Sequence, residues 1–277
     1  MDDYQRLHRW IEERIDDGPV AIVCHKNGDM DTVGSAAALS RSLGSNSRAC
    51  ATHLSSVAKT TVGRMGVQVH KIDPDKPLWP RELLGVIVVD CASLSQVGVQ
   101  LPSGVPICVI DHHDGGSDWS EADLIVRHSV RSTAQIIYEY LSKYRPDSID
   151  KVTASLLLAG MVADTGRFRH ADGSALRVAG ELVENHGIDY EPFIEEMESD
   201  DLSTSQRMAI SKALTRVESI EAGSFFLLHT RGSSHEGIVA NALINARAEV
   251  ALVVRRAKDE TRLIARASKS AISRGIH

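Results

Sequence analysis

The apolar run Val105-Pro-Ile-Cys-Val-Ile110 is followed at once by Asp111, His112 and His113. A short continuous apolar run of this kind is typical of a buried strand. Ionisable side chains at the end of a buried strand cost free energy unless a metal ion or a network of salt bridges compensates them. The stretch therefore predicts a strand with a compensated polar site at its carboxyl end.

Two other apolar runs of the chain also end in ionisable residues. Segments with helical periodicity separate the runs, and strands that alternate with helices form a parallel sheet. The carboxyl ends of parallel strands meet at one edge of the sheet, where folds of this class bind their ligands. The sequence thus predicts one shared site. The two runs are 19–24, followed by His25, Asp29 and Asp31, and 83–89, followed by Asp90.

These features predict an α/β fold, in which an N-terminal parallel sheet with helices on both faces is joined by a linker to a smaller C-terminal α+β domain. We expect the first domain at residues 1–190, a polar and acidic linker and hinge at 191–205, and the second domain at 206–277. In the second domain, two strand-like runs flank a turn at 258–260, which predicts a hairpin.

Composition limits the classes of function. Hydrophobic residues make up 43% of the 277 residues but aromatic residues only 4%, so the core must be aliphatic. A formal net charge of −6 argues against a protein that binds duplex nucleic acid by charge alone. The four cysteines show no CxxC spacing, and we expect buried thiols in a cytoplasmic protein. No apolar stretch reaches about 18 residues, so we expect no membrane association.

The residue types at the predicted site favour divalent cations. Imidazole nitrogens mixed with carboxylates, without thiolates, suit Mn²⁺, Fe²⁺, Co²⁺ or Zn²⁺. A further carboxylate, Asp164, ends an apolar helical stretch and joins the set. Each residue alone has an ordinary interpretation, because a carboxylate after a strand is more often a helix N-cap. Their conjunction favours two ions that share a carboxylate and generate a bridging hydroxide, which would hydrolyse a phosphoester or phosphoanhydride.

Four segments between residues 20 and 170 resemble, in order and spacing, the motifs of the DHH phosphoesterase superfamily. The first of them departs from the superfamily pattern His-x-Asn-Pro-Asp-x-Asp-Ala-x-Gly-Ser at Gly28 and Thr32. Neither change removes a ligand, and we expect Gly28 to loosen its loop. The four segments are His25-Lys-Asn-Gly-Asp29-Met-Asp31-Thr-Val-Gly34-Ser35, Asp90, Asp111-His112-His113 and Asp164-Thr165-Gly166-Arg-Phe168.

The resemblance implies a site with two divalent ions, Mn²⁺ first, with Mg²⁺, Co²⁺ and Zn²⁺ as alternatives. It also implies two catalytic positions beside the ligands. His113 would face the phosphate of the substrate, and Asp111 would orient an imidazole through its other nitrogen. The implied ligands are His25, Asp29 and Asp90 for one ion, and Asp31, Asp90, His112 and Asp164 for the other.

Residues 206–277 resemble the substrate-binding DHHA1 domain of this superfamily more weakly. The resemblance implies that Arg266 and His235 contact the substrate. The alternatives are that Arg266 is a solvated residue of an edge strand and that His235 only begins a helix. The chain ends at 273–277 without the glycine-rich Gly-Gly-Gly-His segment of the superfamily. Either the second domain is incomplete at its C-terminus, or this member binds its substrate differently.

The resemblance implies a metal-dependent phosphoesterase that hydrolyses phosphodiester or phosphomonoester bonds of short oligonucleotides or small nucleotides. Substrates in the superfamily also include pAp, cyclic dinucleotides, single-stranded DNA, polyphosphate and pyrophosphate. Few aromatic residues and an acidic balance argue against a long channel for single strands. Two alternatives stay open. One is a RecJ-like exonuclease that acts on single-stranded nucleic acid in a repair or replication assembly, and the other is a non-catalytic scaffold. A homodimer is compatible with all three.

Overall fold

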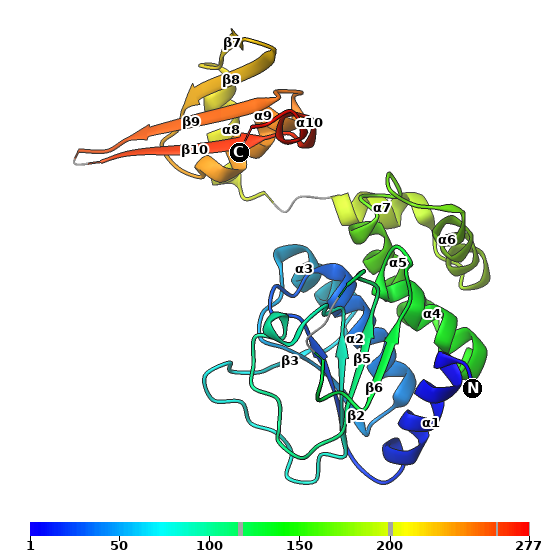
Figure 1. The fold of residues 1–277 in the computed structure, drawn as a ribbon. Coiled ribbons are helices and arrows are strands. Elements are labelled where there is room, and N and C mark those ends of the chain that lie inside the picture. Colours follow the sequence, from blue (N-terminus) through cyan, green and yellow to red (C-terminus); the bar gives the residue numbers. More distant parts are fainter. Residues whose placement is uncertain (116–118, 199–201, 259, 277) are drawn as a thin grey trace. The chain divides into compact units, whose positions relative to one another are not determined.

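The computed structural model describes residues 1–115, 119–198, 202–258 and 260–276. They form two compact units, Met1–Glu198 and Ser199–His277, which are described separately below (Figure 1). The domain limits expected from the sequence remain a prediction. Part of the expected linker, 199–201, and one residue of the expected turn, 259, lie outside the described residues. Among the described residues, no helix combines the length and apolar character needed to cross a membrane.

The first unit is built on a six-stranded parallel sheet with the strand order β3-β2-β1-β4-β5-β6. The chain adds strands outward from β1 to β3, then returns to the other side of β1 and adds β4 to β6. The direction of winding therefore reverses between β1 and β4, and such a switch point is where α/β folds bind ligands. The predicted α/β class is confirmed. The strands are β1 (Val20–Cys24), β2 (Ser47–Ala51), β3 (His70–Lys71), β4 (Gly85–Val89), β5 (Ile107–Asp111) and β6 (Leu124–Arg127).

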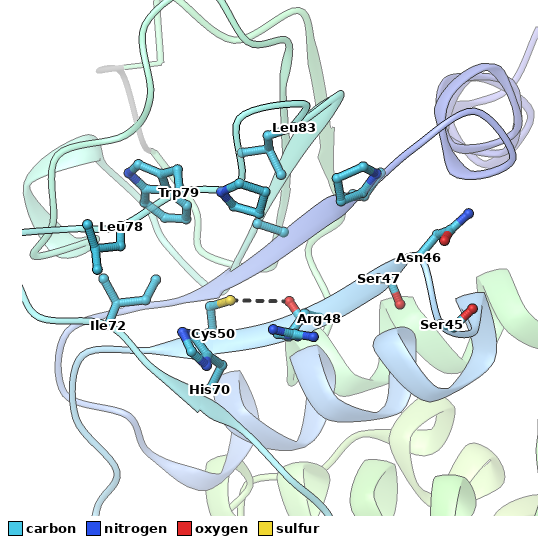
Figure 2. A pocket seen from close by; sticks show the side chains of 14 residues that line it. Ser45, Asn46, Ser47, Arg48, Cys50, His70, Ile72, Leu78, Trp79 and Leu83 are labelled. Atoms are coloured by element: carbon cyan, nitrogen blue, oxygen red, sulfur yellow. Dashed lines mark hydrogen bonds between the residues drawn. The ribbon is translucent and has the colours of Figure 1, made fainter.

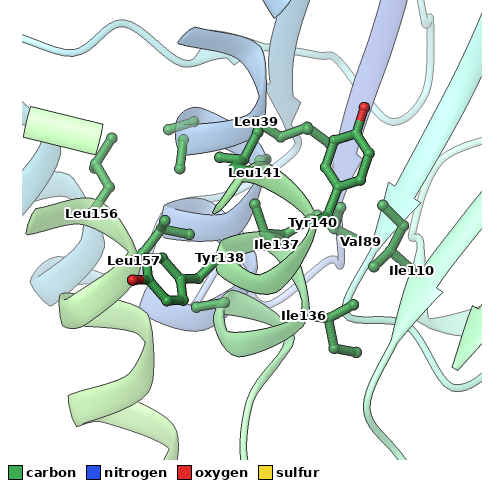
Figure 3. Close-up of a cluster of buried hydrophobic side chains, with 14 of the residues drawn as sticks. Leu39, Val89, Ile110, Ile136, Ile137, Tyr138, Tyr140, Leu141, Leu156 and Leu157 are labelled. Atoms are coloured by element: carbon green, nitrogen blue, oxygen red, sulfur yellow. The ribbon is translucent and has the colours of Figure 1, made fainter. Parts of the chain in front are cut away.

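One face of this sheet is covered by helices, and the core between them is almost entirely aliphatic (Figure 3). α2 packs closely on α5, because a Cβ atom on Gly34 would lie 2.5 Å from the carbonyl oxygen of Leu156. The helices of this unit are α1 (Asp3–Ile15), α2 (Met30–Leu43), α3 (Ser56–Arg64), α4 (Thr133–Tyr144), α5 (Lys151–Asp164), α6 (Gly173–Asn185), α7 (Tyr190–Glu198) and the 3-10 turns η1 (Leu94–Gln96) and η2 (Pro146–Ser148).

The other face differs from the expectation that helices cover both sides. Its apolar cluster combines strand residues with residues of the loops that precede β4, β5 and β6, and η1 is the helical turn described there. Proline explains the difference, because it lacks the N–H that a helix interior needs and disfavours helix in the residue before it. Five of the eight prolines lie in these loops: Pro74, Pro77, Pro80, Pro102 and Pro106.

The second unit contains a four-stranded mixed sheet with the order β10-β9-β8-β7. β9 and β10 pair antiparallel, as a hairpin requires, whereas β8 and β9 run parallel with α9 between them. A small apolar cluster lies between α8, α9 and one face of this sheet. The elements are α8 (Thr204–Leu214), β7 (Glu218–Ala222), β8 (Phe225–Arg231), α9 (Glu236–Asn245), β9 (Val250–Arg256), β10 (Thr261–Ala267) and α10 (Lys269–Ser273).

Candidate metal centre

The switch point between β1 and β4 brings His25 and Asp90 together, because each directly follows the last residue of its strand. Nε2 of His25 lies 3.4 Å from Oδ2 of Asp90 and 2.9 Å from Oδ2 of Asp29. Asp29 caps α2 by accepting a hydrogen bond from the backbone N–H of Thr32 through its other oxygen. One carboxylate thus serves both as a helix cap and as part of the polar site.

His112 lies on the other side of Asp90. Its Nε2 is 3.4 Å from Oδ1 of Asp90 and 3.2 Å from Oδ2 of Asp164, the last residue of α5. Its Nδ1 lies 3.3 Å from the carbonyl oxygen of Val130. A proton on Nδ1, donated to this carbonyl, leaves the Nε2 lone pair free for a cation.

Asp31 is a buried carboxylate of the site, with 1% of its surface exposed. Its side chain accepts hydrogen bonds from the backbone N–H groups of Thr133, at 2.7 Å, and Ala134, at 3.0 Å, at the N-terminus of α4. Burial, followed by the charges of Asp90 and Asp164, holds the pKa of Asp31 well above its usual range. Burial also raises the pKa of Asp164. Burial therefore disfavours the charged form of both carboxylates in the absence of a cation.

The structure brings all six predicted metal ligands together. Within each of the sets given below, the potential ligand atoms lie within 4.8 Å of one another. Imidazole and carboxylate donors, free of thiolates, suit a divalent first-row ion, and the shared Asp90 suits two neighbouring ions. The donor chemistry therefore fits a metal centre. The sets are His25, Asp29 and Asp90; Asp90, His112 and His113; and Asp31, His112 and Asp164.

Asp111 and His113 form a pair beside these ligands. The fully buried Asp111 accepts a hydrogen bond from Nε of Arg127 at 3.1 Å, and its other oxygen lies 2.8 Å from Nδ1 of His113. Burial alone would raise the pKa of Asp111, but the contacts with His113 and Arg127 lower it. The hydrogen bond to Asp111 raises the pKa of His113, whose side chain is 43% exposed. The imidazole that Asp111 contacts is thus the exposed one.

Thr133 is a residue of the site that the sequence analysis missed. Its hydroxyl donates to Oδ1 of Asp90 at 3.0 Å, while its backbone N–H donates to Asp31. The residue therefore holds two of the predicted ligands from one position. A signal was present in the sequence, since adjacent serine and threonine, as at 132 and 133, are residue types that form hydrogen bonds at helix starts.

Gly28 does not loosen the first loop as expected. Its φ of +54° lies in the left-handed region, and an added Cβ would come 1.9 Å from the carbonyl oxygen of His53. Proline, whose φ is fixed near −65°, could not adopt this backbone. The carbonyl of Gly28 accepts a hydrogen bond from the N–H of Ser55 at 2.8 Å, which ties the loop to the start of α3. Glycine is required here by close packing.

The two residues expected to contact substrate lie in the second unit. Arg266 is exposed on the edge strand β10, where it pairs with Ala251 of β9. His235 precedes α9 with a left-handed backbone, and its Nε2 lies 3.1 Å from the hydroxyl of Ser205. His235 makes no side-chain cap for α9. The predicted roles of both residues toward a substrate stay predictions.

Comparisons with known proteins match the part of the chain that contains most of these site residues. The model of the N-terminal domain of the DHH family matches residues 19–161. The chain is 28% identical over 271 residues to an uncharacterized protein of Methanocaldococcus jannaschii, which covers 93% of this chain and 78% of that protein. A second relative is the bifunctional oligoribonuclease and PAP phosphatase NrnA of Bacillus subtilis, to which the chain is 36% identical over 104 residues. The match covers 36% of this chain and 33% of NrnA.

A third relative is the cyclic-di-AMP phosphodiesterase GdpP of Geobacillus thermodenitrificans, 29% identical over 189 residues, or 61% of this chain and 28% of that enzyme. The chain matches about a third of the length of each of these two named enzymes.

Two solved structures share the fold. An exopolyphosphatase-related protein from Bacteroides fragilis superposes with a TM-score of 0.70 at 18% identity, over 96% of this chain and 83% of that one. A putative family II inorganic pyrophosphatase of Methanococcus jannaschii gives a TM-score of 0.55 at 19% identity, over 91% of this chain and 88% of that one.

Proposed function

The chain belongs to the DHH family, and from this premise we propose that it is a metal-dependent phosphoesterase of small nucleotides or short oligonucleotides. The observation that carries the proposal is the convergence of three imidazoles and five carboxylates at the carboxyl ends of β1, β4 and β5 and the end of α5. A site of this composition suits hydrolysis of a phosphoester, because the reaction needs cations near the phosphate and a proton source beside them.

The proposed ligand sets share Asp90 between two ions. Mn²⁺ is the ion that we propose, with Mg²⁺, Co²⁺ and Zn²⁺ as alternatives, because donors of mixed nitrogen and oxygen type suit such cations. When bound, the ions would supply positive charge opposite the phosphate oxygens and lower the pKa of water. The sets are His25, Asp29 and Asp90 for one ion, and Asp31, Asp90, His112 and Asp164 for the other.

His113 would act on the substrate directly. Its contact with Asp111 raises its pKa and so favours the protonated ring, which would donate its proton to a phosphate oxygen. Its exposed side chain is open to a ligand, whereas Asp111 is fully buried and fixed by Arg127. Asp111 would therefore hold the orientation of His113 and stabilise the charge on its ring.

The proposed substrate class rests on the relatives and on composition. NrnA is named as an oligoribonuclease and PAP phosphatase, and GdpP as a cyclic-di-AMP phosphodiesterase. These names indicate small nucleotides and oligoribonucleotides, and a chain with net charge −6 and 4% aromatic residues is poorly suited to hold long single strands. We propose Arg266 and His235 as substrate contacts of the second unit.

A panel of substrates tests the proposal. With Mn²⁺ present, we expect hydrolysis of pAp, of substrates a few nucleotides long or of cyclic dinucleotides, and loss of activity when EDTA removes the metal. Long single-stranded DNA and pyrophosphate complete the panel. Processive degradation of long DNA would favour an exonuclease instead. Binding of metal without hydrolysis of any phosphoester would contradict the proposed function.

A further inference from the structure

A hollow of about 270 Å³ opens on the loop-covered face of the six-stranded sheet (Figure 2). Its fourteen lining residues come from the start of β1, from β2 and the residues before it, from β3 and from the loop before β4. The candidate metal centre follows the end of β1, whereas the hollow is lined by Val20 and Ala21 at its start. The two features therefore lie at opposite ends of the same strand.

Strand pairing explains why the hollow forms. Ala21 pairs with Arg48, and Cys50 pairs with His70, so these four side chains project from one face of the sheet. Ala21 and Cys50 are small, and they leave the floor shallow. A helix would bury such a floor in a sheet covered on both sides, but here the proline-containing loop 72–84 borders it. The space above the small residues stays open.

One wall of the hollow is apolar and partly rigid. Nε1 of Trp79 donates a hydrogen bond to the carbonyl oxygen of Gln100 at 3.3 Å, which fixes the indole ring. Leu78 lines the same wall although its side chain is 87% exposed. Ile72 and Leu83 complete the wall from the buried cluster below it. A fixed indole beside exposed leucine offers a flat apolar surface to a ring-shaped ligand.

The rim of the hollow carries the permanent positive charge of Arg48. Arg48 and His70 line it, and both are exposed. In the described part of the chain, neither side chain has a hydrogen bond or ion pair with the protein. None of the fourteen lining residues is acidic, although the chain carries 37 acidic against 31 basic residues. A cationic rim in an acidic protein selects for an anionic group.

We propose that this hollow is a second ligand site, which binds a small molecule made of a flat ring and an anionic group, such as a nucleoside monophosphate. The ring lies against Trp79 and Leu78, and the anion pairs with Arg48 in the bidentate manner that guanidinium allows. His70 contributes a donor to the same oxygens. The site is independent of the metal centre and does not rest on the proposed phosphoesterase activity.

Tryptophan fluorescence of the full chain tests the site directly. Trp10 and Trp119 are 6% and 5% exposed, so a ligand in the hollow chiefly alters the emission of Trp79. The titration uses AMP with EDTA present, because removing divalent ions suppresses binding at the metal centre. We expect saturable quenching at micromolar to millimolar AMP, weakened by salt because the contact is ionic.

Variants identify the residues responsible. Arg48→Gln keeps the length of the side chain and should raise the Kd for AMP about tenfold. Arg9→Gln is the matched control, since it removes the same charge from an exposed position on α1 and should leave the Kd unchanged. Trp79→Leu should weaken binding about tenfold in calorimetry, because it removes a stacking surface. Thermal unfolding of each variant checks that the fold is intact.

Four probes separate the parts of the ligand. AMP carries ring and anion, adenosine only the ring, inorganic phosphate only the anion, and indole-3-acetate a different ring with a carboxylate. Binding of AMP and indole-3-acetate supports a general site for ring-bearing anions, and binding of AMP alone supports a nucleotide site. Equal affinity for adenosine or for phosphate overturns the proposal, as does an equal Kd for the Arg48→Gln and Arg9→Gln proteins.

Discussion

Asp90 has the most contacts of the predicted ligands, since His25 approaches one of its oxygens and His112 and the hydroxyl of Thr133 the other. We expect Asp90→Asn to reduce Mn²⁺-dependent hydrolysis at least about 100-fold and to weaken binding of both ions, because the shared ligand loses its charge. Asparagine keeps the shape and tolerates the left-handed φ of 62°. Calorimetric titration with Mn²⁺ and a rate assay check this. More than about a tenth of the original activity would refute the shared role.

His113 differs from the ligands in exposure. We expect His113→Ala to lower kcat about 100-fold, because a proton donor is lost, while nearly all of the bound metal is retained. Metal content per chain, measured by atomic emission beside the rate assay, separates these effects. Loss of one ion per chain would instead make His113 a ligand, which its position 3.9 Å from Asp90 allows.

Thr133 holds ligands rather than metal. We expect Thr133→Val, which keeps the shape and the backbone N–H, to weaken metal affinity about tenfold because Asp90 loses the hydroxyl that orients it. Thr133→Ser restores the hydroxyl and should restore the affinity. The readout is the Kd for Mn²⁺. Equal affinities of the valine and serine variants would show that the hydroxyl is irrelevant.

At the scale of residues, the sequence was informative at positions where the chemistry of the site requires a particular residue type. The ends of apolar runs predicted the six positions that the structure brings together, because ionisable groups there need a common compensation. Their role as ligands stays a prediction. Thr133 and Gly28 were missed or misjudged because their roles depend on contacts with distant segments, Asp90 in one case and His53 in the other.

At the scale of elements, the contact between α2 and α5 leads to a prediction about stability. At Gly34, α2 packs so closely on α5 that an added methyl would meet the carbonyl of Leu156. We expect Gly34→Ala to lower the free energy of unfolding by about 1–3 kcal/mol, since overpacking displaces one helix. Chemical denaturation measures the effect. Gly180→Ala in α6 is the control, because nothing lies within 4 Å of its added Cβ and helix propensity should raise stability by up to about 1 kcal/mol. A stabilising Gly34→Ala would contradict the packing argument.

Elements followed the sequence where periodicity was strong. The apolar α5 and the hairpin β9–β10 appear as expected. The loops on the second face escaped prediction because crossover connections in α/β sheets usually contain helices, and here proline prevents them. β7 escaped because all five of its residues are exposed and it shows no apolar alternation.

The stability of the whole protein should depend on pH without metal and lose this dependence when metal is bound. Burial lowers the pKa of His25 and His112, but their hydrogen bonds to carboxylates raise it by more, so the net shift is upward. The pKa of His113 is raised as well. Such groups stabilise the fold below their unfolded pKa of about 6.5, and this contribution is lost as pH rises through the folded pKa. Asp31 and Asp164, with raised pKa, disfavour folding progressively above about pH 4.

We therefore expect the Tm of the metal-free protein to fall between pH 5 and 8, because the raised pKa of these five groups makes the folded chain hold more protons than the unfolded chain. The lowered pKa of Asp29 and Asp111 acts in the other direction, but only below about pH 4. With saturating Mn²⁺ the fall should disappear, since cations bind the deprotonated ligands more tightly as pH rises. Calorimetry with EDTA or Mn²⁺ measures both. A metal-free Tm that rises with pH over this range would contradict the argument.

At the scale of the molecule, the α/β class and a smaller second unit with a mixed sheet could be predicted from the order of apolar and helical segments. The face of the sheet that the helices cover could not be predicted, because it depends on the path by which the chain returns from β3 to β4.

That return path also governs the order of assembly. β1 pairs with β4 in the register Cys24 with Val89, so the chain must close a long loop before His25 and Asp90 can meet. Pairings between distant segments form slowly, and the metal site cannot exist before this one is made. The ions would therefore bind and stabilise the sheet after it has formed, and would not initiate its formation. Their kinetic signature is a slower unfolding rate with little change in the rate of folding.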